Sequence, residues 1–263
     1  MDVYWLEQAE SDVPVENHWL SAGEAARLEA LHIAKRRVDW RLGRWAAKRA
    51  VAAYLDVPRH LQSLANIEIR PAPSGAPEVF ILDTPAPATI SLSHRDGTAL
   101  CAVAPSGAAL GCDLELIEPR SDAFIADYFT AEEQALVARM SLEDRPGLSA
   151  LLWSAKESAL KALGAGLRLD TRSVEVTPVD ALQRCGEGGD KVVEDPALSF
   201  QRGGDNSWHP LLVRHIEGQA FCGWWQQTGN LLRTLVAVPP PLAPIPLAVE
   251  TASRTSTQRL PIS

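Results

Sequence analysis

Apolar residues recur at helical spacing in several stretches of the chain, and the residues at the ends of these stretches are typical helix caps. Ser21 with Glu24, and Thr130 with Glu133, have the spacing of capping boxes, in which two side chains satisfy free backbone N–H groups of the first turn. Gly164 follows the last stretch, and glycine readily adopts the left-handed conformation that ends a helix. The pattern predicts helices over about residues 21–31, 36–55 and 149–163, and a helix start at Thr130.

Short runs rich in β-branched and other apolar residues lie between these helices and predict strands. They cover residues 67–69, 89–93, 100–104, 110–117, 173–177, 211–216, 220–225 and 231–238. Helix followed by strands therefore occurs twice, and the turn Pro105-Ser106-Gly107 separates the two occurrences. The order predicts two α+β lobes, residues 1–104 and 105–238, each of ordinary domain size. No sequence repeat is visible by eye.

The last 25 residues, 239–263, differ from the rest of the chain. They are rich in proline and then in serine and threonine. Repeated proline removes backbone donors and fixes φ, which opposes helices and central strands. We expect an extended or disordered tail.

The composition is that of a globular protein, with 46% hydrophobic and 22% charged residues. The 25 basic and 33 acidic residues give a formal net charge of −8, so a nucleic-acid-binding surface is not expected. No apolar run reaches the roughly 18–20 residues of a membrane span. The acidic N-terminus also lacks the basic and apolar regions of a signal peptide. We therefore expect a cytoplasmic protein that binds neither nucleic acid nor membrane.

Two carboxylates stand two residues apart in the predicted strand 110–117. Period-two geometry places Asp113 and Glu115 on the same face of that strand. Such a pair is stable when solvated, protonated or bridged by a cation, and oxygen ligands of this kind suit Mg²⁺. The alternative is a strand surface that faces solvent, with Cys112 and Leu114 in the core. The sequence alone leaves both interpretations open.

A second group of polar residues lies on the predicted helix 149–163. Trp153, Glu157 and Lys161 follow one another at intervals of four, so they form one stripe. Glu157 is a candidate third carboxylate for a cation or a candidate base, and Lys156 and Lys161 are candidate phosphate ligands. The alternative is an exposed Glu157–Lys161 pair that stabilises only the helix.

A basic stretch and a polar strand end add two candidate anion sites. Between Lys35 and Arg49 there are seven basic residues and one acidic residue, and on a helix Arg37, Arg41, Arg44 and Lys48 share a face. Since the whole chain is acidic, a compact polyphosphate fits this face better than DNA or RNA. Ser93-His94 ends the strand 89–93 before a turn, where ligand-binding residues are often found.

Together and in this order, these motifs resemble the Sfp-type 4′-phosphopantetheinyl transferase family. The pieces are the basic helix, Ser91-Leu92-Ser93-His94, Gly111-Cys112-Asp113-Leu114-Glu115, Phe129-Thr130-Ala131-Glu132-Glu133, and Trp153 to Lys161. The resemblance implies an α+β fold of two similar lobes that form a monomeric pseudo-dimer, with the active site between them. It also implies transfer of 4′-phosphopantetheine from coenzyme A to a serine of an acyl or peptidyl carrier protein, as in a holo-[acyl-carrier-protein] synthase. Adenosine 3′,5′-bisphosphate would be released.

The same resemblance assigns roles to particular residues. Asp113, Glu115 and Glu157 would hold Mg²⁺, and Glu157 would act as the base for the carrier serine, directly or through water. Lys161 would be the second catalytic residue and, with Lys156, would contact phosphate. The residues expected to bind coenzyme A are Arg37, Arg44, Lys48, Ser93, His94, Lys156 and Lys161.

One position departs from the family pattern. Many relatives have Gly-Lys-Pro before the strands of the first lobe, and here the matching residues are Gly75-Ala76-Pro77. Ala76 therefore replaces a lysine that lies near a phosphate of coenzyme A in those relatives. Two other functions fit parts of the sequence, namely a Mg²⁺-dependent phosphodiester or pyrophosphate hydrolase and a non-catalytic binder of coenzyme A or carrier domains.

Overall fold

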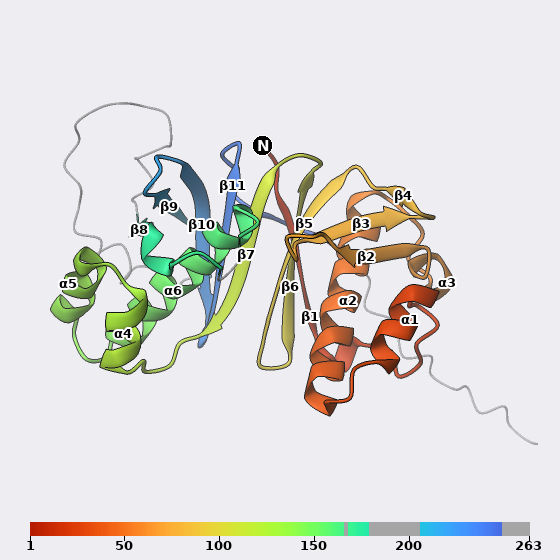
Figure 1. The fold of residues 1–263 in the computed structure, drawn as a ribbon, viewed down its shortest axis with the longest axis horizontal. Helices are drawn as coiled ribbons and strands as arrows, with labels where there is room; N and C mark the ends of the chain where they lie inside the picture. The colour runs from red at the N-terminus through yellow and green to blue at the C-terminus, as the bar shows by residue number, and fades with distance from the viewer. Residues whose placement is uncertain (166–167, 179–205, 249–263) are drawn as a thin grey trace, which may run out of the picture.

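The structure is a computed structural model that describes residues 1–165, 168–178 and 206–248. Two β-sheets stand side by side, and each packs against one long helix (Figure 1). The first sheet contains strands from both ends of the described chain, whereas the second is built from residues 109–238. The mixed α+β architecture agrees with the prediction.

The first sheet has the strand order β12-β1-β6-β5 and packs against α2. A small sheet, β2-β3-β4, lies beside it with the short helices α1 and α3. Their bounds are β1 Tyr4–Ala9, α1 Ala22–Glu29, α2 Ala34–Tyr54, α3 Leu61–Leu64, β2 Ile67–Pro71, β3 Pro77–Ile81, β4 Thr84–Pro85, β5 Ala88–Arg95, β6 Thr98–Pro105 and β12 Ile245–Pro246. Trp19, Leu42 and Trp45 are central to the core that these elements enclose.

The second sheet has the order β7-β11-β10-β9-β8 and packs against α6. Its elements are β7 Ala109–Leu116, α4 Asp122–Tyr128, α5 Ala131–Arg139, α6 Arg145–Ala162, β8 Val174–Pro178, β9 His209–His215, β10 Ala220–Thr228 and β11 Leu231–Val238. Gly111 lets α6 lie directly on β7, because a Cβ at this position would be 1.8 Å from the carbonyl oxygen of Ser158. This close approach brings the stripe on α6 next to the carboxylates on β7.

The two sheets meet where β5 runs beside β7. Ser91 on β5 accepts a hydrogen bond of 2.9 Å from the backbone N–H of Cys112 on β7. On β1 and β11, Glu7 and Arg233 form a two-pronged ion pair with distances of 2.6 and 2.9 Å. A separate apolar cluster that includes Leu100 and Leu235 fills the junction. Residues on β5 and β7 can therefore belong to one site.

Of the two expectations for the proline-rich segment, extended or disordered, the extended one describes residues 239–248. Ile245 and Pro246 pair in parallel with Tyr4 and Trp5 as an edge strand, a place where proline is tolerated because its missing N–H is not needed there. The N-terminal ammonium also donates to the carbonyl of Pro240 over 2.8 Å. Residues 249–263 lie outside the described residues.

The predicted helices and all the predicted strands are present, with shifted ends. The last helix, α6, begins at Arg145, four residues before the predicted start, because Pro146 lies in its first turn, where no backbone N–H is required. Strands β1, β3 and β4 and helices α3 and α4 had no clear periodic signal. No helix in the described parts of the chain is long and apolar enough to cross a membrane.

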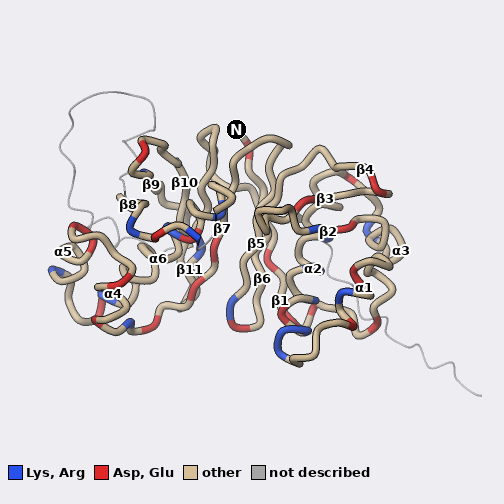
Figure 2. The backbone as a smooth tube through the Cα atoms, viewed as in Figure 1, with Lys and Arg blue, Asp and Glu red and all other residues tan. Residues whose placement is uncertain are grey.

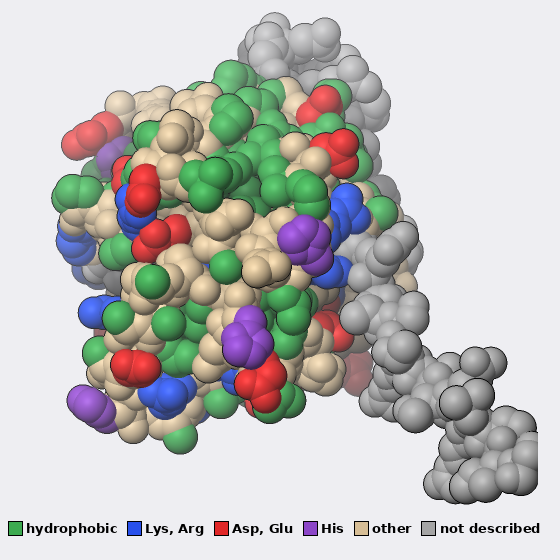
Figure 3. Space-filling model, turned by 90° about the vertical axis from the view of Figure 1, so that its right-hand side faces the viewer, with side chains coloured by type: hydrophobic (Ala, Val, Ile, Leu, Met, Phe, Trp, Pro, Cys, Tyr) green, Lys and Arg blue, Asp and Glu red, His purple; other side chains and the backbone are tan. Residues whose placement is uncertain are grey.

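Charged residues are spread over the described chain, and one basic stretch stands out at the start of α2 (Figure 2). On the face of the molecule shown in Figure 3, acidic, basic and apolar side chains are interspersed. That face therefore has no broad basic surface of the kind that nucleic acids require.

Candidate active site

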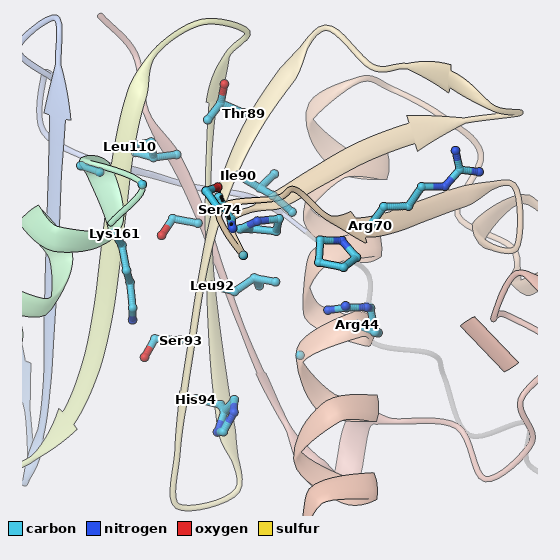
Figure 4. A pocket seen from close by; sticks show the side chains of 18 of the residues that line it. Arg44, Arg70, Ser74, Thr89, Ile90, Leu92, Ser93, His94, Leu110 and Lys161 are labelled. Atoms are coloured by element: carbon cyan, nitrogen blue, oxygen red, sulfur yellow. Dashed lines mark hydrogen bonds between the residues drawn. The ribbon is translucent and has the colours of Figure 1, made fainter. Parts of the chain in front are cut away.

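A cavity of about 570 Å³ lies between α2, the loop from β2 to β3, strand β5 and the end of α6. Arg44 on α2 and Lys161 on α6 point toward β5 from opposite sides, and β5 contributes Ser93 and His94 to the lining (Figure 4). The loop contributes Ser74 to Pro77, including Ala76. Four of the segments singled out in the sequence thus meet at one cavity.

Asp113 lies at the edge of this cavity and is almost fully buried, with 4% of its surface exposed. One carboxylate oxygen, Oδ1, accepts from Ser93 Oγ and from Lys161 Nζ, each over 2.8 Å. The other oxygen, Oδ2, is buried and has no hydrogen-bond partner among the described residues. An unpartnered buried carboxylate oxygen is costly, so this atom is available for a ligand.

Lys161 connects α6 to β7. Its ammonium also donates to the carbonyl of Cys112 over 3.0 Å. Burial lowers the pKa of this ammonium, but Asp113, Cys112 and Glu157 together outweigh burial, so the pKa lies above its usual value and the group stays charged. The alternative of an exposed Glu157–Lys161 helix pair is therefore wrong, because Lys161 pairs with Asp113 across two elements.

Glu115 lies beside Asp113 on the same strand face, as the spacing predicted. Its Oε1 accepts from the indole N–H of Trp153 over 3.0 Å, and its Oε2 is 3.0 Å from Arg120 and 3.7 Å from Arg95. Burial and then repulsion from Asp113 raise the pKa of the Glu115 carboxyl, although the two arginines oppose this. The indole and the guanidinium groups fix the carboxylate in place.

Glu157 is the third carboxylate and is partly buried on the same face of α6. Burial, followed by repulsion from Asp113, raises the pKa of the Glu157 carboxyl to about 7, while Lys161 opposes the shift. A carboxyl that titrates near neutral pH can take and release a proton under ordinary conditions. Glu157 is thus the group in this cluster with the properties of a general base.

The cluster offers the kind of donors that magnesium prefers. Its carboxylates repel one another, and the free oxygen of Asp113 is buried, so a divalent cation would relieve both costs. In the described ranges, however, no three His, Cys, Asp or Glu side chains already stand in a metal-binding arrangement. The residue types fit Mg²⁺, and the ligand set of Asp113, Glu115 and Glu157 stays a prediction.

Arg44 is the basic residue of α2 that reaches the cavity. Burial lowers the pKa of its guanidinium, and Glu24, 3.8 Å away, partly offsets this effect. Its Nε is buried and has no hydrogen-bond partner in the part of the chain that the structure describes. Arg37, also predicted to bind coenzyme A, is not in the cavity lining and donates instead to the carbonyls of Leu28 and Leu31 at the end of α1.

Two lysines predicted to contact phosphate lie elsewhere. Lys48 and Lys156 have no exposed surface, and each forms a buried ion pair, with Glu24 and Glu133 respectively. Binding a phosphate would require either lysine to leave a buried carboxylate unpaired, which is strongly unfavourable. The structure therefore does not support a phosphate role for either residue.

Sequence reasoning missed several residues of the site. Arg70 lines the cavity, and Arg95 and Arg120 contact Glu115. Arg70 and Arg95 lie near the ends of β2 and β5, and Arg120 lies in the loop after β7, so no periodic pattern marks their direction. Trp153 was recognised as part of the stripe on α6, but its hydrogen bond to Glu115 depends on how α6 packs on β7.

Comparisons with known proteins agree with this geometry. Residues 109–204 match the family model of the 4′-phosphopantetheinyl transferase superfamily, and this range includes β7, α5 and α6. The 4′-phosphopantetheinyl transferase HetI of Nostoc sp. (strain PCC 7120 / SAG 25.82 / UTEX 2576) is 28% identical over 178 residues, which cover 66% of this chain and 73% of HetI. The chain is therefore similar to 4′-phosphopantetheinyl transferases, and the part that matches the family model carries the three carboxylates and Lys161.

Proposed function

We propose that this protein transfers 4′-phosphopantetheine from coenzyme A to a serine hydroxyl of an acyl or peptidyl carrier protein. The observation that supports this best is the meeting of Asp113, Glu157 and Lys161 at the edge of a cavity that Arg44 and His94 also line. The similarity to the 4′-phosphopantetheinyl transferase superfamily supports the same reaction. The finer assignments, a cytoplasmic monomeric holo-[acyl-carrier-protein] synthase, are part of the proposal.

In the reaction, the serine oxygen attacks the phosphorus next to the pantetheine arm. A new P–O bond forms, the pyrophosphate bond breaks, and adenosine 3′,5′-bisphosphate leaves. Glu157 takes the serine proton, since a base with a pKa of about 7 is half ionised at neutral pH. Lys161 stays protonated beside Asp113 and stabilises negative charge on the phosphates.

Binding depends on the other residues of the cavity. Arg44, Ser93 and His94 would contact the nucleotide part of coenzyme A, and Ala76 would lie near a phosphate without offering a charge. Asp113, Glu115 and Glu157 would hold Mg²⁺, which neutralises pyrophosphate charge when it is bound. Phosphoryl transfer needs mainly positioning and charge neutralisation, and these residues supply both.

The arrangement of the two larger sheets supports two lobes related as a pseudo-dimer, each with one of these sheets packed against one long helix. We place the division between residues 104 and 105, at the last residue of β6 and just before β7. In this proposal the substrate cavity belongs to both lobes, because α2 and β5 come from the first and α6 from the second.

An incubation of the full chain with coenzyme A, Mg²⁺ and an apo carrier domain tests the proposal. Mass spectrometry of the carrier should show the addition of one phosphopantetheine per domain, and Glu157→Gln should abolish most of this gain. Consumption of coenzyme A without a mass gain would indicate a hydrolase. Binding of coenzyme A without consumption would indicate a non-catalytic binder, and either result would overturn the proposed function.

A further inference from the structure

We infer that Lys156 is a positioning residue that fixes α6, and with it Glu157, through a buried ion-pair clamp that the first half of the molecule repeats. This inference rests on the proposed function, because Glu157 is its reacting group. This positioning role replaces the contact with phosphate that the sequence predicted for Lys156. We call the Glu133–Lys156 arrangement the C-terminal clamp and the Glu24–Lys48 arrangement the N-terminal clamp.

The C-terminal clamp begins at the first turn of α5. Glu133 closes a capping box, since Thr130 N–H donates to its Oε2 over 2.9 Å and its own N–H donates to Thr130 Oγ1 over 3.3 Å. Its Oε1 accepts from the backbone N–H of Val176 on β8 over 2.9 Å. One carboxylate therefore joins a helix start to a strand.

Lys156 adds α6 to this arrangement. Its ammonium is 2.8 Å from Glu133 Oε2 and donates to the carbonyls of Thr171 and Val174 over 3.0 and 2.5 Å. All three ammonium donors are thus used, and both charged side chains are buried. Directional bonds on three sides restrict rotation and sliding of α6 at the residue that precedes Glu157.

The N-terminal clamp has the same parts in the same order. Glu24 closes a capping box with Ser21, accepts from Ile69 N–H on β2 over 3.1 Å, and forms an ion pair with Lys48 on α2. Lys48 also donates to backbone carbonyls, including that of Leu64 over 3.1 Å. Both clamps join the start of a short helix, the middle of a long helix and an adjacent strand.

With the structure as a guide, the repeat is also visible in the sequence. Trp19-Leu20-Ser21-Ala22-Gly23-Glu24 corresponds to Tyr128-Phe129-Thr130-Ala131-Glu132-Glu133, and Trp45-Ala46-Ala47-Lys48 corresponds to Trp153-Ser154-Ala155-Lys156. The two tryptophans match as well. Trp45 donates to Gln8 on β1 and Trp153 to Glu115 on β7, both over 3.0 Å.

The halves differ at the positions that perform chemistry. Glu157, Lys161 and Glu115 of the second half correspond to Arg49, Ala53 and Gln8 of the first. The clamp is therefore common to both halves, whereas the carboxylate cluster is present only in the second. The N-terminal clamp therefore serves as an internal control, because it has the same kind of ion pair but no reacting group beside it.

The test compares Lys156→Met with Lys48→Met in the full-length protein. Each change leaves one buried glutamate unpaired, so both should lower the melting temperature by a similar amount, roughly 10 °C. At a temperature where both variants are folded, Lys156→Met should lower kcat for transfer to an apo carrier about 10- to 100-fold, because a displacement of about 1 Å has an effect of this size. Its KM for coenzyme A should change little, and Lys48→Met should keep a kcat near that of the wild type.

The double variant Lys156→Met with Glu133→Gln separates position from stability. This variant has no unpaired buried charge, so it should recover most of the melting temperature that Lys156→Met loses. The kcat should stay low, because α6 still lacks its three directional bonds. Recovery of kcat together with stability would overturn the inference, as would equal losses of kcat in the two single variants or an increase in the coenzyme A KM without a loss of kcat.

Hydrogen exchange gives a result that does not depend on activity. Lys156→Met should increase exchange of the amides in α6 from Ser154 to Ala162 more than those of α2, and Lys48→Met should do the reverse. Unchanged exchange in α6 would refute the clamp. If the wild type modified no carrier, the proposed function would fail, and the exchange result would still decide whether the clamp exists.

Discussion

At the scale of single residues, Glu157 links the geometry of the cluster to pH. Its carboxyl titrates near pH 7 in the folded protein and near 4.5 when unfolded, so the folded state holds more protons between these values. The free energy of unfolding therefore falls as pH rises from 4.5 to 7. For the metal-free protein we expect this group to contribute a loss of at most roughly 3 kcal/mol across the window.

Urea unfolding in the presence of a chelator, at several pH values in this range, checks that expectation. The free energy of unfolding of Glu157→Gln should fall less than that of the wild type as pH rises to 7, because the uncharged amide has no proton to lose. Asp113→Asn should also reduce the loss, since Asp113 is the first of the charges that raise the pKa of Glu157. Identical pH profiles for wild type and Glu157→Gln would show that this carboxyl has an ordinary pKa.

Ala76 is a second residue with a measurable consequence. It lines the cavity at a position where many relatives have lysine, so Ala76→Lys should lower the KM for coenzyme A several-fold by adding a charge near phosphate. Ala72→Lys places the same charge in the same loop outside the cavity lining and serves as the control. Equal effects of the two variants, or none, would show that position 76 does not face a phosphate.

Local geometry explains which of the candidate residues the sequence could group together. Period two on a strand and intervals of four on a helix were enough to group Asp113 with Glu115, and Glu157 with Lys161. The same reasoning failed for Lys48 and Lys156, because helix spacing does not tell which side of a helix faces the core. Their partners, Glu24 and Glu133, lie more than 20 residues away in the sequence.

At the scale of elements, the contact between α6 and β7 depends on Gly111. A methyl group there would overlap the carbonyl of Ser158, which is backbone and cannot turn away. Gly111→Ala should therefore push α6 away from β7, lower stability by about 3 kcal/mol or more, and remove most activity. A thermal melt and the carrier assay measure both effects.

Gly43→Ala on α2 is the matched control for the stability effect. Nothing lies within 4 Å of a Cβ at Gly43, and alanine favours helices over glycine by roughly 1 kcal/mol. This variant should be as stable as the wild type or slightly more so. A Gly111→Ala protein with normal stability would show that α6 and β7 have room to separate without cost.

Element ends were less predictable than element centres. Capping boxes at Ser21 and Thr130 identified two helix starts correctly, because the signal is local. Strand β12 was not predicted, because its proline-rich sequence has no strand pattern of its own. It is extended because it pairs with β1, which is more than 200 residues away in the sequence.

At the scale of the whole molecule, residues 239–248 connect the second sheet to the first. Hydrogen bonds of 2.8–2.9 Å join Leu242, Ile245 and Leu247 to the carbonyls of β1 and the residues before it. At about 1 kcal/mol each, their loss should lower the melting temperature by roughly 6–12 °C. A chain that ends at Val238 should show this loss, and a chain that ends at Ala248 should not.

The pairing of β1 with β12 also decides when the protein can complete its fold during synthesis. The ribosome releases β1 some 240 residues before β12, so the outer edge of β1 stays unpaired while all the residues between them are made. An open strand edge is a template for pairing with other chains. Nascent or prematurely terminated chains of this protein are therefore expected to associate through Tyr4 and Trp5, and residues 239–248 cover this edge once they are made.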